Sequence, residues 1–326
     1  MVRGVNGLIQ VADFENIRNK MVLVMGTGST GYGQVDLASI SEVADSQIDE
    51  FNMDNLRADL LRARQHQTGT TESLTNVDPN TTVSETIYAE YDTMSDLVTT
   101  NNRVCADNQR SVEAGISSTY TPSWNGILYH QVIVTFTTAL QARYFFNAGG
   151  QIRFSASRTG AASNTKDTEW TNMLGNNTTP SGMGTIFFDY TQTGTVSGTA
   201  AVGRAGTGSS IGFYDLTTTN QQIYITTAAA GVYLENDYNI QARLNSGFGS
   251  GTEPTQVIFT IQFRDDDTGD RPSPSPPPPF GPLVDELVTG TIGSVVTMAR
   301  PSGSNVSFAA GNIGFSQTAI TTTVLS

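Results

Sequence analysis

The stretch that decides the fold runs from Trp124 to Gly160 and reads WNGILYHQVIVTFTTALQARYFFNAGGQIRFSASRTG. Two parts of it, Ile127–Thr137 and Gln141–Ser157, are rich in the β-branched and aromatic residues that are enriched in strands. Within the second part, Asn147–Gly150 contains two glycines and is typical of a turn. We predict that Ile127–Thr137 and Gln141–Ser157 form paired antiparallel strands of a sandwich.

Short runs of the same kind recur farther along the chain, separated by clusters of glycine, asparagine, serine and threonine. The run Asn239–Leu244 alternates polar and apolar residues, which is typical of a strand with one buried face. Six or more such runs favour an antiparallel β-sandwich. One short helix, Asp167–Leu174, is predicted to cover an end of the sandwich with Trp170 and Met173. The further predicted strands are Ile186–Tyr190, Ile211–Tyr214, Gln222–Thr226, Val232–Leu234, Tyr238–Leu244 and Val257–Phe263.

The region from about residue 12 to residue 110 has helical spacing instead. Apolar residues recur there three or four positions apart, which places them on one face of a helix. Asp13 and Ser84 are candidate caps for the first and third helices. Each apolar stripe is narrow, so we expect the helices to pack on each other, on the β domain or on a neighbouring subunit. The stripes are Phe14, Ile17 and Met21; Met53, Leu56 and Leu60; and Ile87, Tyr91, Met94 and Val98.

A proline-rich linker, residues 271–282, marks the clearest boundary in the chain. It includes the run Arg271–Phe280, RPSPSPPPPF, in which consecutive prolines favour an extended polyproline-II spacer. The following residues, 283–326, have strand composition but are too few for a confident core of their own. We therefore predict four parts: an N-terminal helical region (1–110), a β-sandwich (111–270), the linker, and a C-terminal β-rich arm (283–326). The arm is expected to dock on a neighbouring subunit, so that truncation after Phe280 would leave a soluble sandwich.

Composition narrows the range of partners. Only 14% of the 326 residues are charged, and the formal net charge is −13. An acidic chain repels phosphate backbones, so a direct nucleic-acid partner is not expected. The single cysteine, Cys105, cannot form an internal disulfide. The N-terminus lacks the apolar run of a signal peptide, and no stretch approaches the ~18 apolar residues of a membrane span. We expect synthesis in a reducing host cytoplasm and no membrane partner.

The stretch Trp124–Gly160 also resembles, over its whole length, a virion structural protein of contractile-tailed bacteriophages, particularly those that infect cyanobacteria. The segments Ala12–Ile17 (ADFENI) and Gly31–Gln34 (GYGQ) resemble the start of the same family, and the similarity recurs near Tyr238–Asp270. The resemblance implies a component of the phage particle in the neck, tail or baseplate. Its expected partners are other virion structural proteins and further copies of itself.

Two other functions stay open at this point. The first alternative is a receptor-binding or glycan-binding appendage of the same particle, whose glycine- and threonine-rich loops contact a host-surface glycan. The second is an enzyme such as a tail-borne glycan hydrolase, which needs two carboxylates ~5–10 Å apart across a groove. The sequence singles out no such pair and no internal repeat of a fibre shaft. We therefore expect a structural protein with no catalytic residues and no cofactor.

The segment Gly26–Gly31, GTGSTG, matches the dinucleotide-binding pattern GxGxxG. In that motif the glycines must open a helix whose amides hold the pyrophosphate. Here Gly31 is followed by Tyr32–Gln34, a poor helix start, and no alternation of strands and helices follows. We predict a glycine-rich loop at the end of a helix.

The acidic segment Asp265–Asp270, DDDTGD, suggests a calcium loop in which Asp265, Asp267 and Asp270 would be ligands. The fifth position is a glycine, however, and no glutamate stands at position twelve, so an acidic loop leading into the linker is favoured. The two histidines, His66 and His130, lie in no pattern typical of a catalytic triad or a zinc site.

Overall fold

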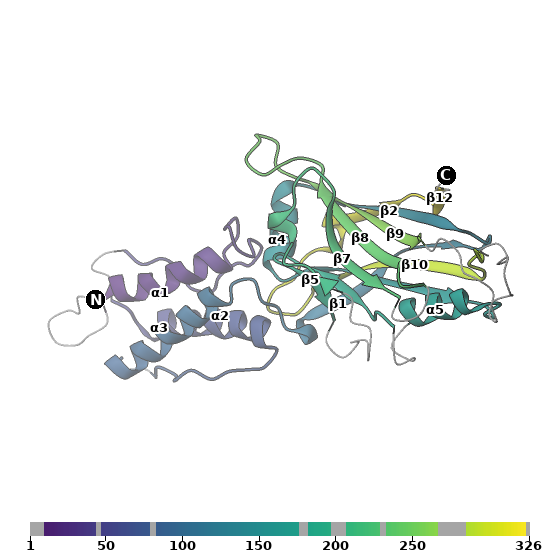
Figure 1. Ribbon diagram of the computed structural model, residues 1–326. Helices are drawn as coiled ribbons and strands as arrows, with labels where there is room; N and C mark the ends of the chain where they lie inside the picture. The colour runs from purple at the N-terminus through teal and green to yellow at the C-terminus, as the bar shows by residue number, and fades with distance from the viewer. Residues whose placement is uncertain are drawn as a thin grey trace, which may run out of the picture. The chain divides into compact units, whose positions relative to one another are not determined.

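The computed structural model describes residues 10–43, 47–78, 83–175, 182–196, 207–228, 233–266 and 285–323. The chain divides into two compact units (Figure 1). The helical unit consists of residues 1–112, 140–150 and 299–312, and the β unit consists of residues 113–139, 151–298 and 313–326. Both units are therefore built from segments that lie far apart in the sequence.

Three helices form the centre of the helical unit: α1 (Val11–Val24), α2 (Glu50–Thr68) and α3 (Glu85–Thr100). The predicted apolar stripes point inward, and they stabilise the unit because their side chains leave water. The Lys20 ammonium of α1 lies 2.8 Å from the Asp92 carboxylate of α3, which fixes the two helices side by side. The buried residues of the stripes are Phe14, Ile17, Met21, Met53, Leu56, Leu60, Tyr91, Met94 and Val98.

The helix starts follow ordinary capping chemistry with one difference from the sequence prediction. The Ser84 hydroxyl accepts a hydrogen bond from the Ile87 amide, so Ser84 caps α3 as predicted. Asp13 is not the N-cap of α1, because the helix begins earlier, after Gln10. Its carboxylate instead accepts from the Gln10 amide at 3.2 Å, as the third helical residue does in a capping box.

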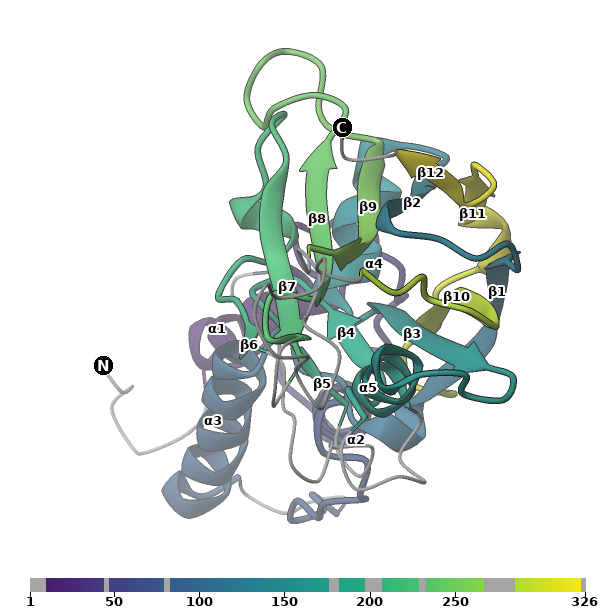
Figure 2. The same ribbon diagram turned by 45° about the vertical axis from the view of Figure 1, so that its right-hand side comes forward.

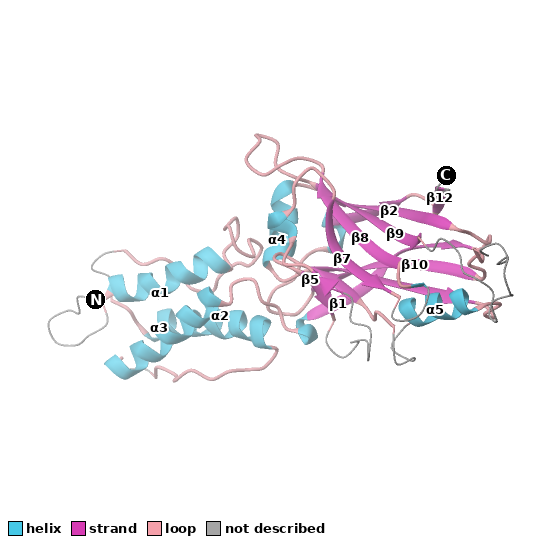
Figure 3. Cartoon of the chain, in the orientation of Figure 1, coloured by secondary structure: helices cyan, strands magenta, loops and turns pink. Residues whose placement is uncertain are grey.

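The prediction that Gln141–Ser157 is one strand with an internal turn was wrong. Its first part is the helix α4 (Ala139–Asn147), drawn in cyan in Figure 3. Only the second part is a strand, β3 (Gln151–Thr159). Gly149, with φ of 79°, donates to the Phe146 carbonyl, and Gly150 donates to the Phe145 carbonyl. This is a Schellman motif, so the two glycines end a helix and do not form a hairpin turn.

The β unit is a mainly antiparallel β-sandwich formed by two sheets. The five-stranded sheet has the order β1-β10-β3-β4-β5, and the seven-stranded sheet has the order β11-β2-β9-β8-β7-β6, with β12 also paired to β2. The strands are β1 (Arg110–Tyr120), β2 (Gly126–Phe136), β4 (Ile186–Phe188), β5 (Thr193–Thr195), β6 (Thr207–Gly208), β7 (Gln221–Thr227), β8 (Asp237–Leu244), β9 (Gln256–Asp265), β10 (Thr291–Pro301), β11 (Ile313–Gln317) and β12 (Thr321–Thr323), together with β3.

The structure differs from the predicted strands in three details. β2 pairs with β9, β11 and β12, whereas β3 belongs to the other sheet, so the two parts of the opening stretch are not paired with each other. The predicted strand Ile211–Tyr214 is not a strand, and its last two residues belong to a short 3-10 helix, Phe213–Asp215. Tyr233 and Leu234 lie in a turn, and Val232 lies outside the described residues.

The prediction that residues 283–326 form a separate C-terminal arm was also wrong. β10 lies between β1 and β3 in one sheet, while β11 and β12 run along β2 in the other (Figure 2). β1 and β10 approach so closely that a Cβ at Gly115 would lie 1.6 Å from the Val296 carbonyl oxygen. The arm thus completes the sandwich of its own chain in this structure. The proline-rich linker lies outside the described residues.

The two sheets pack face to face through aromatic rings and are linked along both edges. The Phe259 ring lies 4.9 Å from the Phe154 ring of the opposite sheet, measured between centroids. On one side the Thr193 amide donates to the Ser209 carbonyl at 2.9 Å. On the other side the Gln317 side chain donates to the Ser117 carbonyl at 2.8 Å. These links satisfy edge groups that would otherwise invite pairing with other chains.

We expect Phe154→Ala to lower the free energy of unfolding of the β unit by ~3–5 kcal/mol, because the fully buried ring would leave a cavity between the sheets. Urea denaturation followed by tryptophan fluorescence is the measurement, since both tryptophans, Trp124 and Trp170, belong to the β unit. Leu234→Ala is the control, because that side chain is 53% exposed and should change the value by less than ~0.5 kcal/mol. A loss below ~1 kcal/mol for Phe154→Ala would contradict the packing described here.

Candidate functional site: a buried charge network around helix α5

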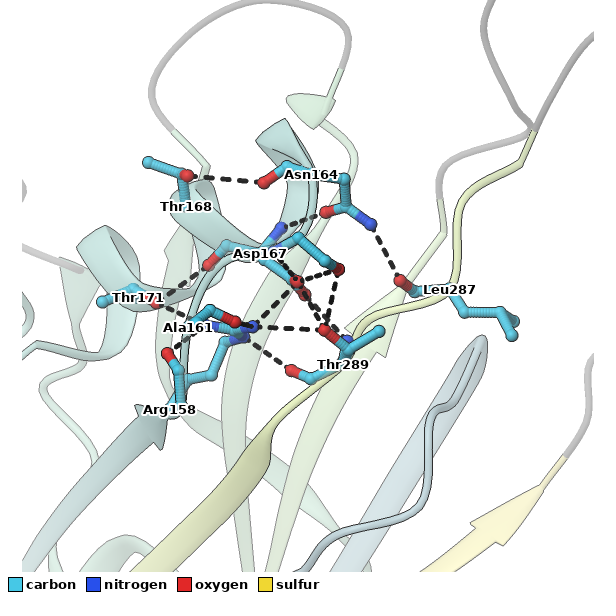
Figure 4. Close-up of polar contacts among 10 residues, drawn as sticks. Arg158, Ala161, Asn164, Asp167, Thr168, Thr171, Leu287 and Thr289 are labelled. Carbon is cyan, nitrogen blue, oxygen red and sulfur yellow. Dashed lines mark hydrogen bonds and ion pairs between the residues drawn. The ribbon is translucent and has the colours of Figure 1, made fainter.

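Helix α5 (Thr165–Leu174) carries the densest group of buried charges among the described residues of the β unit. Trp170 and Met173 face the core as predicted, with 1% of each exposed. At its N-terminal end, Asp167 pairs with Arg158 of β3 at 2.8 Å, and both side chains are fully buried (Figure 4). A buried ion pair stabilises a fold only when further hydrogen bonds satisfy its remaining atoms.

Those further bonds are present. The Asp167 carboxylate accepts from the Thr289 amide at 2.7 Å, from the Thr289 hydroxyl at 2.6 Å, and from the Ser163 amide and hydroxyl at 2.9 and 2.8 Å. Burial alone would raise the pKa of Asp167, but the donors on Thr289 and Ser163 outweigh it and hold the pKa below its ordinary value. Arg158 donates in turn to the Thr289 carbonyl at 2.7 Å and to the Thr171 hydroxyl at 3.0 Å.

Residues 285–289, DELVT, which we name the re-entry segment, follow the proline-rich linker and bind to this network. The Asn164 side chain caps α5 by accepting from the Asp167 amide, and it also donates to the Leu287 carbonyl at 3.1 Å (Figure 4). Val288 is fully buried and exchanges two backbone hydrogen bonds with Trp124, at 3.0 and 2.8 Å. The Tyr233 hydroxyl donates to the Glu286 carboxylate at 2.9 Å.

Lys166 joins the two described segments on either side of residues 267–284. Its ammonium lies 3.2 Å from the Asp265 carboxylate at the end of β9 and 2.7 Å from the Asp285 carboxylate of the re-entry segment. It also lies 5.9 Å from the centre of the Tyr233 ring, where a cation–π attraction operates. Because one buried cation holds both carboxylates, the chain leaves β9 and returns to the sandwich at the same point.

A second carboxylate near this end of the sheet has an altered pKa. Burial raises the pKa of Asp237 to about 6, and Asp266 adds to the effect, whereas Arg264 opposes it. The Arg264 guanidinium lies 3.3 Å from one Asp237 oxygen, and the other oxygen has no hydrogen-bond partner. Asp237 is 5% exposed, so the group is a buried acid at the start of β8.

Both histidines are fully buried and hydrogen-bonded. His130 of β2 lies between the sheets, with Nδ1 2.9 Å from the Ser294 hydroxyl and Nε2 2.8 Å from the Gln317 side-chain oxygen. His66 of α2 lies 3.0 Å from the Ala148 carbonyl through Nε2. Burial lowers the pKa of both rings, that of His66 to about 4, so both are neutral at pH 7. Their contacts tie neighbouring segments of the fold together.

The low pKa of His66 gives the helical unit a defined pH dependence. The ring takes up a proton in the unfolded chain near pH 6.5 but in the fold only near pH 4. The contribution of the neutral ring to the free energy of unfolding is therefore fully present above pH 6.5 and is lost as the pH falls from 6.5 to 4. We expect this ring to account for a loss of about 3 kcal/mol between pH 7 and pH 4. Urea denaturation followed by circular dichroism at 222 nm measures it. His66→Gln should remove this part of the pH dependence, and an unchanged profile in that variant would contradict the assignment.

The glycine-rich segment Gly26–Gly31 forms the loop that ends α1, as predicted. The Tyr32 amide donates to the Val24 carbonyl at 2.6 Å, and the Gly28 amide donates to the Gly33 carbonyl at 3.0 Å. A Cβ at Gly31 would lie 2.1 Å from the Val24 carbonyl oxygen, so the glycine is needed for the chain to fold back on the helix. The loop therefore follows a helix and does not open one.

We expect no dinucleotide to bind this loop, because three of its amides, those of Gly26, Gly28 and Ser29, are already bonded to backbone carbonyls and no helix begins there. Isothermal titration calorimetry with NAD, NADP, FAD and ATP at millimolar concentration should give no heat of binding. A micromolar dissociation constant for any of them would overturn this prediction and revive an enzymatic function.

The suggested calcium ligands are only partly covered by the structure. Asp265 is 1% exposed and paired with Lys166, so a cation already faces its carboxylate. Asp267 and Asp270 lie outside the described residues. Among the residues that the structure describes, no group of three histidine, cysteine or acidic side chains is placed to hold a metal ion.

The sequence did not single out Arg158, Lys166 or Asp167 as a network. One local signal was present, since Asn164 followed by Asp167 three positions later is a capping pattern. The partners Asp265, Asp285 and Thr289 are more than ninety residues away, and no spacing rule connects them to α5.

A scan against protein-family models and searches of curated proteins and of solved structures found no match to this chain. Among the described residues, no helix is both long and apolar enough to cross a membrane.

Proposed function

We propose that this protein is a structural component of the virion of a contractile-tailed bacteriophage, placed in the neck, tail or baseplate and joined to its neighbours through subunit contacts. The resemblance of Trp124–Gly160, Ala12–Ile17 and Gly31–Gln34 to a virion family is the observation that carries this proposal. Its expected partners are other virion proteins and further copies of the same chain.

The use of buried charge supports a structural role. Arg158 and Asp167 are fully buried in the β unit, and their contacts hold chain segments together. Lys166 joins the end of β9 to the re-entry segment in the same way. A particle protein benefits from such fixed segments, because it must keep its shape while neighbours bind.

Apolar side chains on the helical unit support subunit contacts. Most of the large apolar side chains that are exposed among the described residues belong to this unit. Val43 is 74% exposed and Phe51 is 64% exposed, in a chain that is otherwise rich in polar surface residues. Burial of such groups against another protein is favourable, and exposed apolar groups commonly mark interaction sites.

Purified phage particles that carry this gene test the proposal. We expect peptides of this chain in the mass spectrum of banded virions, and immunogold label at the neck, tail or baseplate. Label confined to fibre tips would favour the receptor-binding alternative. Absence of the chain from particles that are otherwise complete would overturn the proposal.

A matched pair of variants tests the apolar contact. Phe51→Ser in the helical unit is expected to lower incorporation into particles, while Thr68→Ser, a conservative change on the same helix, should leave it unchanged. Circular dichroism of both purified variants controls for folding. Normal incorporation of Phe51→Ser would show that Phe51 takes no part in assembly.

A further inference from the structure

Lys166 is a buried amine in contact with two carboxylates of its own chain. Its side chain and that of Asp265 are both 0% exposed. The Lys166 Nζ lies 3.2 Å from each of the two Asp265 oxygens, so it faces the carboxyl carbon between them. The Asp285 Oδ1 lies 2.7 Å from the same nitrogen. A nucleophile, an electrophilic carbon and a proton acceptor therefore meet at one point of the β unit.

Aromatic side chains line this contact. Trp170 lies one helical turn after Lys166 on α5, so the two side chains are neighbours on one helix face. Phe263 and Asp265 lie two positions apart on β9 and point to the same side of the sheet. The Trp170 and Phe263 rings are 6.3 Å apart between centroids. The Tyr233 ring lies 5.9 Å from the Lys166 nitrogen. The amine and the carboxyl group thus lie among rings that exclude bulk water.

Such surroundings favour the loss of charge. Removal from water disfavours the charged forms of an ammonium and of a carboxylate, so transfer of a proton from one to the other costs less than it does in solution. A lysine that has lost its proton is a nucleophile, whereas arginine keeps its charge in proteins. The equally buried pair Arg158–Asp167 is therefore unable to react in this way.

We propose that an isopeptide bond joins the Lys166 Nζ to the Asp265 Cγ, formed by the folded chain itself with Asp285 as the proton acceptor. Groups held in fixed contact react as if the partner were present at ~10⁵–10⁸ M. The exclusion of water opposes the reverse reaction, which is hydrolysis. The bond closes a loop between positions 99 residues apart, and cross-links across long loops restrict the unfolded chain most. The proposal goes beyond the virion role and does not depend on it.

The reaction is a condensation. One ammonium proton passes through the Asp285 carboxylate to an oxygen of Asp265, and the neutral Nζ then forms a bond to the Asp265 Cγ. A second proton leaves the nitrogen by the same route and reaches that oxygen, which departs as water when its bond to Cγ breaks. One positive and one negative charge disappear, one amide and one water are formed, and Asp285 returns to its starting form.

Asp285 is placed to carry the protons. Its side chain is 33% exposed, so it lies between the buried reactants and the solvent into which the water leaves. The Asn125 side-chain amide donates to its second oxygen and fixes the orientation of the carboxylate. The other oxygen is thereby directed at the Lys166 nitrogen.

Intact-mass spectrometry of the full-length protein in denaturant tests the proposal, because unfolding removes ion pairs but leaves an amide bond in place. We expect most chains to be lighter than the sequence mass of 34.8 kDa by the mass of one water molecule. Lys166→Arg is the matched control, since it keeps the positive charge but supplies no reactive amine, and it should show its full sequence mass. A full sequence mass for the unmodified protein would overturn the proposal.

Tandem mass spectrometry of tryptic peptides locates the bond. We expect no cleavage after Lys166, because trypsin does not cut at an acylated lysine, and we expect this residue to be linked to Asp265. A link from Lys166 to Asp285, or the loss of water at another place in the chain, would refute the assignment.

Asp285→Asn tests the proton transfer, because asparagine has nearly the same shape but no carboxylate to accept the proton. We expect the linked fraction of freshly purified protein to fall severalfold. Near-ultraviolet circular dichroism like that of the unmodified protein would show that the fold around Trp170 is kept. An unchanged linked fraction would contradict the role given to Asp285.

Discussion

A chain that ends at Phe280 is expected not to form a stable β-sandwich. The truncation removes β10 from between β1 and β3, so both neighbouring strands lose a pairing partner inside the sheet. It also removes Thr289, which satisfies Asp167 and Arg158, and it uncovers the edge of β2. Buried charges that lose their partners each cost several kcal/mol, and the net stability of a domain is only ~5–15 kcal/mol.

Solubility, near-ultraviolet circular dichroism and urea denaturation followed by tryptophan fluorescence measure this effect. We expect the truncated chain to be insoluble, or soluble without a cooperative unfolding transition. A chain that ends at Thr323 is the matched control and should unfold like the full-length protein. A cooperative transition in the chain that ends at Phe280 would show that the sandwich is complete without β10, and it would restore the idea of a separate arm.

Elements with a strong local pattern could be predicted from the sequence. The stripes of α1, α2 and α3 recur at helical spacing, and each stripe faces the core of the helical unit. The alternation in Asn239–Leu244 matches β8, whose side chains face opposite sides of its sheet. In both cases the period of the apolar residues carries the necessary information.

Two elements, α4 and β10, could not be predicted from the local sequence pattern. In α4 the residues Tyr144–Phe146 favour a strand by composition, while the helix is set by the C-terminal cap at Gly149 and Gly150. A glycine pair after an aromatic run can be a hairpin turn or a helix end, and only the packing around it decides. The place of β10 is a long-range property, since its neighbour β1 lies about 180 residues earlier in the chain.

The buried charge network could not be predicted either, because its members lie far apart in the sequence. In the sequence, Lys166 and Asp167 look like an ordinary charged pair in the first turn of a surface helix. Their burial depends on the re-entry segment, which arrives from beyond the proline-rich linker. A charge can be recognised as buried only after the segment that covers it has been placed.

Asp167→Ala is the point substitution from which we expect the largest loss of stability. It would leave the Arg158 guanidinium buried without its carboxylate and would remove the acceptor of the Thr289 and Ser163 donors. Breaking one partner of a buried ion pair costs ~3–5 kcal/mol. Urea denaturation followed by tryptophan fluorescence should report this loss for the β unit, in which Trp170 lies on the same helix.

Three further variants separate charge from packing. Thr168→Ala, an exposed position on the same helix, should change the free energy of unfolding by less than ~0.5 kcal/mol. The double variant Arg158→Met with Asp167→Leu should recover much of the loss, because no buried charge is left without its partner.

Because the pKa of Asp167 lies below its ordinary value in the fold, the carboxylate stabilises the protein above pH 3.8, and this stabilisation disappears as the pH falls through the lowered value. The difference between the unmodified protein and Asp167→Asn should therefore be largest near neutral pH and shrink in acid. A difference that is independent of pH would show that Asp167 acts through its shape and hydrogen bonds alone and would contradict the role given to its charge.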